Sequence, residues 1–284
     1  MNDHTPINNG AINKDQSNDT QGNDTKSNDP WARFRSSTRA RIGLGRAGDG
    51  LPTTALLDFQ LAHARARDAV HSAVDFDRLA TDLSPLPTLR VHSAAPDRPT
   101  YLRRPDLGRK LDAASAQRLS ADPVAGGWDI LFVIADGLSA AAVQVNAAPL
   151  IHACHDRLSG WRIGPVVLAE QARVALGDDV ATRLGARLVA LLVGERPGLS
   201  AAESLGVYLT WDAKPGRADS ERNCISNIHA DGLSIGAAAD KLCWLATEAA
   251  RLKLTGVGLK EDAPSLPGPG NDDKNTQPGL IENA

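Results

Sequence analysis

The chain has 284 residues, which is enough for one large domain or two small ones with a full core. A net charge of −3 and the lack of a basic stripe exclude nucleic-acid binding as a function class. No apolar run approaches the roughly 20 residues that span a bilayer, and three cysteines without C-x-x-C spacing or a signal peptide predict reduced thiols in a soluble, cytoplasmic protein.

Both ends of the chain have the composition of disordered segments. Residues 1–29 are dense in Asn, Asp and Gly with almost no large apolar side chains, and residues 261–284 form a tail rich in Pro and Gly. Such segments cannot bury enough surface to offset the entropy lost on ordering. The composition therefore predicts two disordered tails with folded structure between them.

Residues 30–119 are predicted to form a mainly helical region. The spacing of apolar residues favours a helix over 53–74, and Pro105 favours the start of another helix over 104–120. The glycines of "RIGLGRAGDG" (41–50) do not spell the G-x-G-x-x-G of a dinucleotide loop, and no P-loop is present. These glycines are interpreted as a turn before the first long helix.

Residues 120–260 alternate between strand and helix patterns. Short, continuous apolar runs predict strands that are buried on both faces. Strands are expected at 128–136, 162–170, 187–195 and 206–212, and helices at 137–158, 174–186 and 234–254. This alternation predicts an α/β fold, with a Rossmann-like, mostly parallel sheet and helices on both of its faces.

The loops at one edge of this sheet are the expected ligand site, because ligands of open parallel sheets bind at the carboxyl ends of the strands. The rule selects loops at 135–139, 169–174, 194–200 and 221–229, all of which are polar or contain glycine. In "GERPGLS" (194–200), Glu195 and Arg196 could form a surface ion pair or belong to the site. Their position after a buried strand makes this loop the expected rim of a binding crevice.

Other candidate motifs favour structural roles. His152 and His155 could share a metal, but they lack a downstream set of partner ligands and are interpreted as packed or surface histidines. Ser139 lacks a G-x-S-x-G context and is interpreted as the N-cap of the helix that follows it. Cys224 has no base beside it and is interpreted as a packing thiol. These motifs alone leave the ligand open.

Five phrases along the chain resemble the small (light) chain of ethanolamine ammonia-lyase. They are "RARIGLGRAG" (39–48), "RPDLGRKL" (104–111), "DGLS" (136–139), "LVGERPGL" (192–199) and "CISNIH" (224–229). The resemblance runs from about Trp31 to about Gly258 in the same order and with similar spacing. The two tails depart from the family's pattern.

The resemblance implies a subunit of an adenosylcobalamin-dependent lyase. Such an enzyme deaminates ethanolamine, and related vicinal amino alcohols, to acetaldehyde and ammonia by a radical mechanism. A large subunit, a TIM barrel, holds the substrate, and cobalamin lies between the two chains, of which six of each assemble. The resemblance also implies a bacterial microcompartment within the cytoplasm. It assigns neither a catalytic residue nor a metal ligand to this chain.

Carried over by position, the family's cobalamin contacts fall at Val174, Glu195 and Cys224, all within the selected loops. A corrin is an apolar disc fringed with amides, so Glu195 can accept hydrogen bonds from amide N–H groups and Val174 can pack against the disc. Cys224 can contribute van der Waals contact or backbone groups. The chain lacks the D-x-H-x-x-G motif by which a protein histidine replaces dimethylbenzimidazole, so this base is expected to stay on cobalt.

Two alternatives remain open from the sequence. One is a non-catalytic cobalamin- or nucleotide-binding assembly module, which would bind the cofactor at full strength without a partner. The other is a stand-alone α/β enzyme, for which the sequence shows no nucleophile or dinucleotide fingerprint. The N-terminal segment lacks the amphipathic period of an encapsulation helix, so a solvated tail is expected there.

Overall fold

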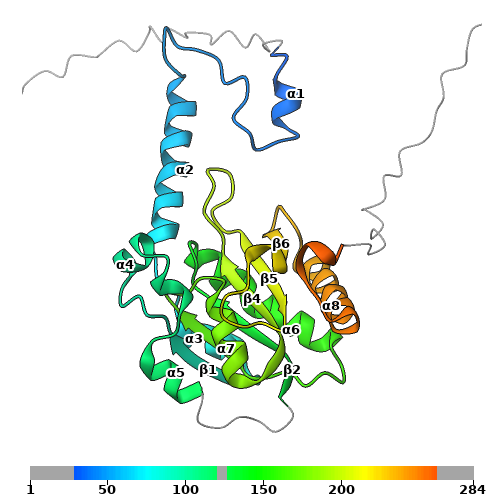
Figure 1. The fold of residues 1–284 in the computed structure, drawn as a ribbon. Helices are drawn as coiled ribbons and strands as arrows, with labels where there is room; N and C mark the ends of the chain where they lie inside the picture. Colours follow the sequence, from blue (N-terminus) through cyan, green and yellow to red (C-terminus); the bar gives the residue numbers. More distant parts are fainter. Residues whose placement is uncertain (1–28, 120–126, 261–284) are drawn as a thin grey trace, which may run out of the picture.

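A six-stranded sheet lies at the centre of the computed structural model, which describes residues 29–119 and 127–260 (Figure 1). The strands are β1 (Thr88–His92), β2 (Trp128–Ala135), β3 (Val166–Glu170), β4 (Ala186–Gly194), β5 (Leu205–Trp211) and β6 (Asn223–Ile228). Their order in the sheet is β1-β3-β2-β4-β5-β6. The first three pairings in this order are parallel and the last two are antiparallel. Apart from Asp29, the two predicted tails lie outside the described residues.

Helices cover both faces of the sheet because successive residues of a strand point to opposite faces. Along β2, Ile130, Phe132 and Ile134 pack into one core cluster, and Leu131, Val133 and Ala135 pack into the other. The first core lies beneath α3 (Phe76–Asp82), α6 (Ala140–Arg157) and α8 (Ile235–Leu252), and the second beneath α5 (Ala113–Leu119) and α7 (Leu176–Leu184). The α/β class and the mostly parallel sheet are confirmed.

The remaining helices lie before β2 in the chain. They are α1 (Ala32–Arg35), α2 (Thr53–His71) and α4 (Arg98–Arg103). Three short 3-10 turns also occur along the chain: η1 (Leu107–Arg109) before β2, and η2 (Asp219–Glu221) and η3 (Gly256–Gly258) after β5. The carboxyl end of α2 adjoins the body of the protein, and the rest of the helix projects away from it toward α1 (Figure 1). No helix among residues 29–119 and 127–260 combines the length and the apolar character needed to cross a membrane.

In residues 30–119, the sequence pattern missed one strand and placed one helix wrongly. This region contributes β1 to the sheet edge, where only Val91 is buried, so the strand lacks the continuous apolar run by which buried strands are recognised. The single helix expected over 104–120 is replaced by η1 and α5. Gly108 lies within η1, and a Cβ there would come within 3.1 Å of both the Tyr101 and the Arg173 side chains. This close packing explains the glycine that interrupts the pattern.

The segment 221–229 was expected to be a loop, and this expectation was also wrong. Most of it forms edge strand β6, which pairs antiparallel with β5. Only Ile225 and Ile228 of this strand are buried, and its other residues are polar or small. An edge strand with one solvated side therefore carried the composition of a loop.

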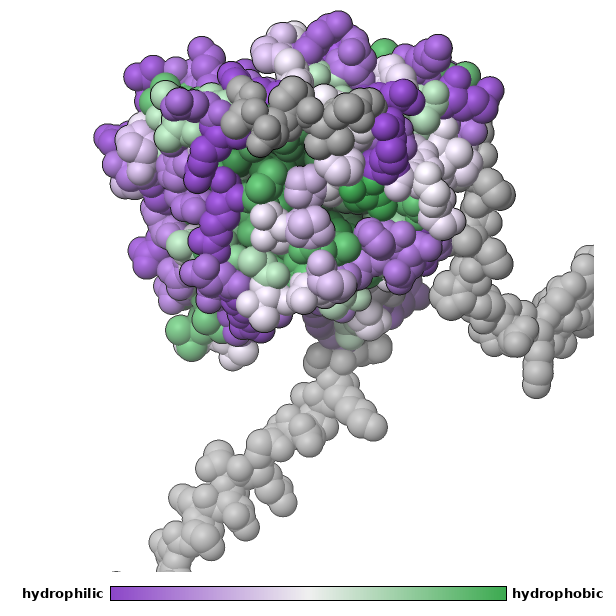
Figure 2. All heavy atoms as spheres, turned by 90° about the horizontal axis from the view of Figure 1, so that it is seen from below, coloured by the Kyte–Doolittle hydropathy of each residue, from purple (hydrophilic) through white to green (hydrophobic). Residues whose placement is uncertain are grey.

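The amino-terminal edge of the parallel strands faces away from α1 and α2. Figure 2 shows this end of the molecule, where hydrophobic side chains reach the surface in a central hollow with polar residues around it. Trp211 lies at the same edge, because it pairs with Leu188 near the beginning of β4. A cavity of about 590 Å³ there is lined by Trp211, Trp161 and Ala250 among others.

A buried ion pair ties α7 to the antiparallel part of the sheet. The Arg222 guanidinium donates to both carboxylate oxygens of Asp178 at 2.7 Å, and both side chains are only 1% exposed. The same guanidinium also donates to the Thr210 hydroxyl on β5 at 2.9 Å. A bidentate pair at this depth fixes one relative position of helix and sheet.

Replacing Arg222 with methionine is expected to destabilise the protein by about 3–5 kcal/mol, because it leaves the Asp178 carboxylate buried and unpaired. The free energy of unfolding from urea titration of the purified chain measures this. Arg251→Met is the matched control, because Arg251 forms an exposed pair with Glu248 and its loss should change stability far less. Equal effects of the two substitutions would contradict the structural role of the buried pair.

Candidate functional site at the carboxyl edge of the sheet

A cavity of about 320 Å³ lies where the carboxyl ends of β2 and β4 diverge. The chain passes from β2 through α6 to β3 on one side of β2, and from β3 through α7 to β4 on its other side. Such a reversal of direction opens a crevice between strand ends. The cavity is lined by Tyr101, Gly137, Leu138, Arg173, Val174, Val193, Gly194, Glu195, Arg196 and Tyr208.

Asp136 fixes the loops on either side of this crevice. Its carboxylate accepts backbone N–H groups from Gly137 at 3.0 Å, Gln171 at 3.0 Å and Ala172 at 2.9 Å. The Arg98 guanidinium lies 3.4 Å from the same carboxylate. Burial raises the pKa of Asp136, and the three N–H donors and Arg98 oppose that rise by stabilising the charged form. One side chain thus joins the loop after β2 to the loop after β3.

Glycines allow the ends of β2 and β4 to approach each other closely. Gly137 has a φ of +59°, and a Cβ there would lie 2.4 Å from the Gly194 carbonyl oxygen. A Cβ on Gly194 would lie 2.2 Å from the Ser139 carbonyl oxygen. Ser139 caps α6 by accepting the Ala142 N–H at 3.2 Å, which confirms its interpretation as an N-cap.

Glu195 is held in the loop that follows β4. Its Oε2 accepts the Ser204 hydroxyl at 2.5 Å and the Asn227 N–H at 3.3 Å. The carboxylate lies over Gly206, where a Cβ would come within 2.8 Å of Oε1. Glu195 is therefore oriented by neighbouring strands, and no ion pair with Arg196 is formed. The expected rim position of "GERPG" is confirmed, because this loop leaves the sheet at the carboxyl end of β4.

Cys224 lies away from the loops, on edge strand β6. It is opposite Tyr208 of β5, whose side chain lines the cavity, whereas Cys224 itself does not line it. Partial shielding from water raises the pKa of the Cys224 thiol, and the nearby Glu195 carboxylate adds to the rise. Burial, with contributions from Cys224 and Glu195, raises the pKa of Tyr208 to about 12. Both groups are therefore neutral near pH 7, and the thiol is not activated as a nucleophile.

Val174 and Arg173 reach the cavity from the loop after β3. The Arg173 guanidinium stacks 4.6 Å from the centre of the Tyr101 ring, and Arg98 stacks 4.8 Å from it. Burial raises the pKa of Tyr101 to about 12, with a further contribution from Asp136. Val174 and Glu195 thus line one cavity, as their positions on neighbouring loops predict.

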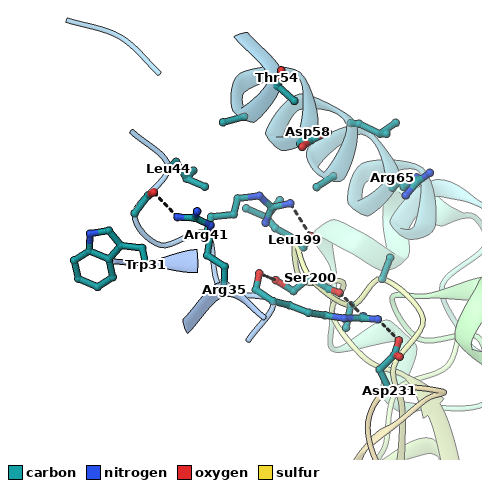
Figure 3. A pocket seen from close by; sticks show the side chains of 18 of the residues that line it. Trp31, Arg35, Arg41, Leu44, Thr54, Asp58, Arg65, Leu199, Ser200 and Asp231 are labelled. Carbon is teal, nitrogen blue, oxygen red and sulfur yellow. Dashed lines mark hydrogen bonds and ion pairs between the residues drawn. The ribbon is translucent and has the colours of Figure 1, made fainter. Parts of the chain in front are cut away.

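A larger hollow, of about 1220 Å³, lies between the N-terminal segment, α2 and the loops that follow β4 and β6. Figure 3 shows Thr54, Asp58 and Arg65 of α2 on one side of it, with Leu199, Ser200 and Asp231 on the other. Two arginines of the N-terminal segment before α2 bind the loops on the second side. Arg39 binds the Ser200 carbonyl oxygen and Asp231, and Arg41 donates to the Leu199 carbonyl oxygen. The glycine-rich segment 41–50 is a turn before α2, as interpreted.

Sequence reasoning missed the tyrosines of the smaller cavity. The chain has two tyrosines, Tyr101 and Tyr208, and both line this cavity. Their scarcity was an available signal, although no local pattern connects them. Within the described parts of the chain, no group of three or more His, Cys, Asp or Glu side chains is placed to hold a metal. His152 instead contacts the Asp82 carbonyl oxygen at 2.9 Å.

Fold and site together define an α/β protein with a ligand-sized cavity at the carboxyl edge of a mostly parallel sheet. Comparison with known proteins gives the family. The profile of the ethanolamine ammonia-lyase light chain family matches residues 28–260. The chain belongs to this family.

Curated relatives are similar over most of the chain. An ethanolamine ammonia-lyase small subunit of Ralstonia nicotianae (strain ATCC BAA-1114 / GMI1000) is 53% identical over 240 residues, which cover 82% of this chain and 89% of the relative. A protein of the same name from Pseudomonas fluorescens (strain Pf0-1) is 51% identical over 240 residues, covering 82% and 88%. One from Pseudomonas putida (strain GB-1) is 51% identical over 242 residues, with the same coverage.

Proposed function

We propose that this chain is the small subunit of an adenosylcobalamin-dependent ethanolamine ammonia-lyase. In this proposal it closes over the cofactor at an interface with a catalytic large subunit, a TIM barrel, and six of each chain assemble. The enzyme acts in the cytoplasm within a bacterial microcompartment. Membership of the family carries the proposal, and the cavity shared by Val174 and Glu195 supports it.

The residues at the carboxyl edge fit part of a cobalamin. The cavity offers apolar contact from Val174, an oriented acceptor in Glu195 and an orphaned donor in Arg173, whose buried Nε has no hydrogen-bond partner among the described residues. Cobalamin carries apolar faces, amide donors and acceptor oxygens that complement these groups. A whole corrin far exceeds 320 Å³, so this chain would cover one part and its partner the rest.

The chain's own residues bind and orient in this proposal. When bound, adenosylcobalamin supplies the radical for deamination by homolysis of its cobalt–carbon bond. Glu195 accepts an amide N–H of the fringe, Val174 packs against an apolar surface, and Cys224 contributes contact through β6 and Tyr208. The neutral thiol of Cys224 takes no part in proton transfer or bond formation.

The exposed apolar face of α2 supports a protein partner. The sequence pattern predicts a buried face that includes Leu57 and Leu61, yet these side chains are 57% and 51% exposed. Ala69, near the carboxyl end, is the one buried residue of this helix. Apolar residues at helical spacing that their own chain leaves uncovered are typical of an interface. In the proposal, α2 therefore packs against the large subunit.

Leu57→Glu is expected to abolish, or reduce at least tenfold, co-purification with the large subunit, because it places a charge in the proposed apolar interface. Circular dichroism of the variant should remain unchanged, since Leu57 is exposed in the isolated chain. His63→Glu places a negative charge at an exposed position about 120° around α2 from Leu57 and is the matched control. Assembly of the Leu57 variant at the wild-type level would contradict docking through this face.

Ethanolamine deaminase activity with adenosylcobalamin is expected only when this chain is co-expressed with the large subunit. The physical reason is that the chain supplies no catalytic residue and only part of a cofactor site in this proposal. The assay compares acetaldehyde release by each chain alone and by the pair. Absence of activity in the pair, together with full cobalamin binding by this chain alone, would instead support a non-catalytic binding module.

Glu195→Ala is expected to weaken adenosylcobalamin binding by about 1.5–3 kcal/mol, or roughly tenfold to hundredfold, through loss of a charge-assisted hydrogen bond. Spectrophotometric titration of the assembled complex measures the dissociation constant. Glu203→Ala is the control, because Glu203 is an exposed carboxylate of the same loop that does not line the 320 Å³ cavity. An unchanged dissociation constant in an intact complex would rule out this role for Glu195.

A further inference from the structure

Two arginines enter the cavity from loops on opposite sides of β2. Arg173 follows β3 and Arg196 follows β4, and both line the cavity with Glu195. The Glu195 carboxylate already accepts hydrogen bonds from Ser204 and Asn227 through Oε2. The lining of the cavity therefore includes two arginines and one glutamate whose carboxylate is partly engaged elsewhere, which is a formal excess of positive charge.

Arg173 is held in place but is not fully satisfied. Its guanidinium stacks on the Tyr101 ring, and Nη2 donates to the Tyr101 carbonyl oxygen at 3.1 Å. Its backbone N–H donates to the Gly108 carbonyl oxygen at 2.8 Å. The buried Nε has no hydrogen-bond partner among the described residues. A buried donor without an acceptor is destabilising, so this site favours an acceptor that comes from outside the chain.

Arg196 is exposed and makes no hydrogen bond or ion pair with any residue in the described parts of the chain. It lies between Glu195 and Pro197, and the fixed φ of proline restricts the backbone there. The helices α6 and α7 also begin within two residues of the cavity-lining Leu138 and Val174. Their positive dipole ends add to the preference for an anion.

We propose that Arg173 and Arg196 bind a phosphate group, namely the phosphodiester in the nucleotide part of adenosylcobalamin. This inference rests on the proposed function and assigns which part of the cofactor this chain covers. Guanidinium groups match phosphate oxygens in geometry and charge. The side chains of the corrin are neutral amides, so the phosphodiester is the anionic group on its periphery. A cavity of about 320 Å³ suits a part of the nucleotide better than the corrin ring.

The test compares three cofactor forms on the assembled complex. Adenosylcobalamin carries phosphate and base, adenosylcobinamide phosphate carries phosphate without the base, and adenosylcobinamide carries neither. Arg196→Gln should weaken binding of the first two by about tenfold or more and leave adenosylcobinamide binding unchanged. Arg196→Lys should retain part of the affinity because it keeps the charge. Spectrophotometric titration gives each dissociation constant without a measurement of activity.

Arg173→Gln should give the same pattern, and Arg196→Gln keeps the test decisive if loss of the Tyr101 stack disturbs folding. Arg46→Gln is the control, because Arg46 is an exposed arginine away from the cavity. Unchanged binding of adenosylcobalamin to Arg196→Gln overturns the inference, as does an equal loss for all three cofactor forms. The inference is also overturned if Arg196→Gln weakens co-purification with the large subunit but leaves the cofactor affinity unchanged. Arg196 would then pair with a carboxylate of the partner.

Failure of the proposed function has a different signature. In that case the wild-type complex binds none of the three cofactor forms, and the inference falls with the proposal on which it rests. A second outcome is that the wild-type complex binds adenosylcobalamin tightly, but neither the wild type nor the variants prefer it over adenosylcobinamide. This outcome leaves the proposed function intact and overturns only the assignment of the two arginines to the phosphate.

Discussion

The Asp136 carboxylate is the constraint on which the carboxyl edge of the sheet depends. It accepts three backbone N–H groups from the loops after β2 and β3 and lies beside Arg98 of α4. Arg98 in turn donates to the Val70 carbonyl oxygen at the end of α2. A single buried charge therefore joins the sheet, two loops and the base of the projecting helix. Removing it would leave several buried donors without an acceptor.

Preorganisation of this edge has a consequence for binding. Val174 and Arg173 follow the loop that Asp136 holds, whereas Glu195 and Arg196 follow β4, which meets β2 through the glycine contacts at Gly137. A ligand at this crevice therefore meets side chains whose backbone is already ordered, which lowers the entropic cost of binding. The open side of the cavity and the uncovered apolar face of α2 both fit a chain that works with a partner.

Much of the fold was predictable from local pattern. The apolar runs of β2 and β4 identify strands buried on both faces, and the Ser139 cap marks the start of α6. Edge strands were not predictable in the same way, because β1 and β6 bury few residues and carry polar side chains. The η1 turn, which takes the place of the expected helix start, packs Gly108 against Tyr101 and Arg173, and the contact with Arg173 joins segments far apart in the chain.

The sequence by itself determined the fold class, the position of the main strands and the family, because periodicity and motif are local properties of the chain. It also placed Glu195 and Val174 on loops at one edge, since the carboxyl ends of parallel strands share an edge. Only the tertiary structure decided that Tyr101 and Tyr208 line the same cavity as the side chains of those loops. Those residues come from separate elements, and strand order and side-chain packing, rather than spacing along the chain, bring them together.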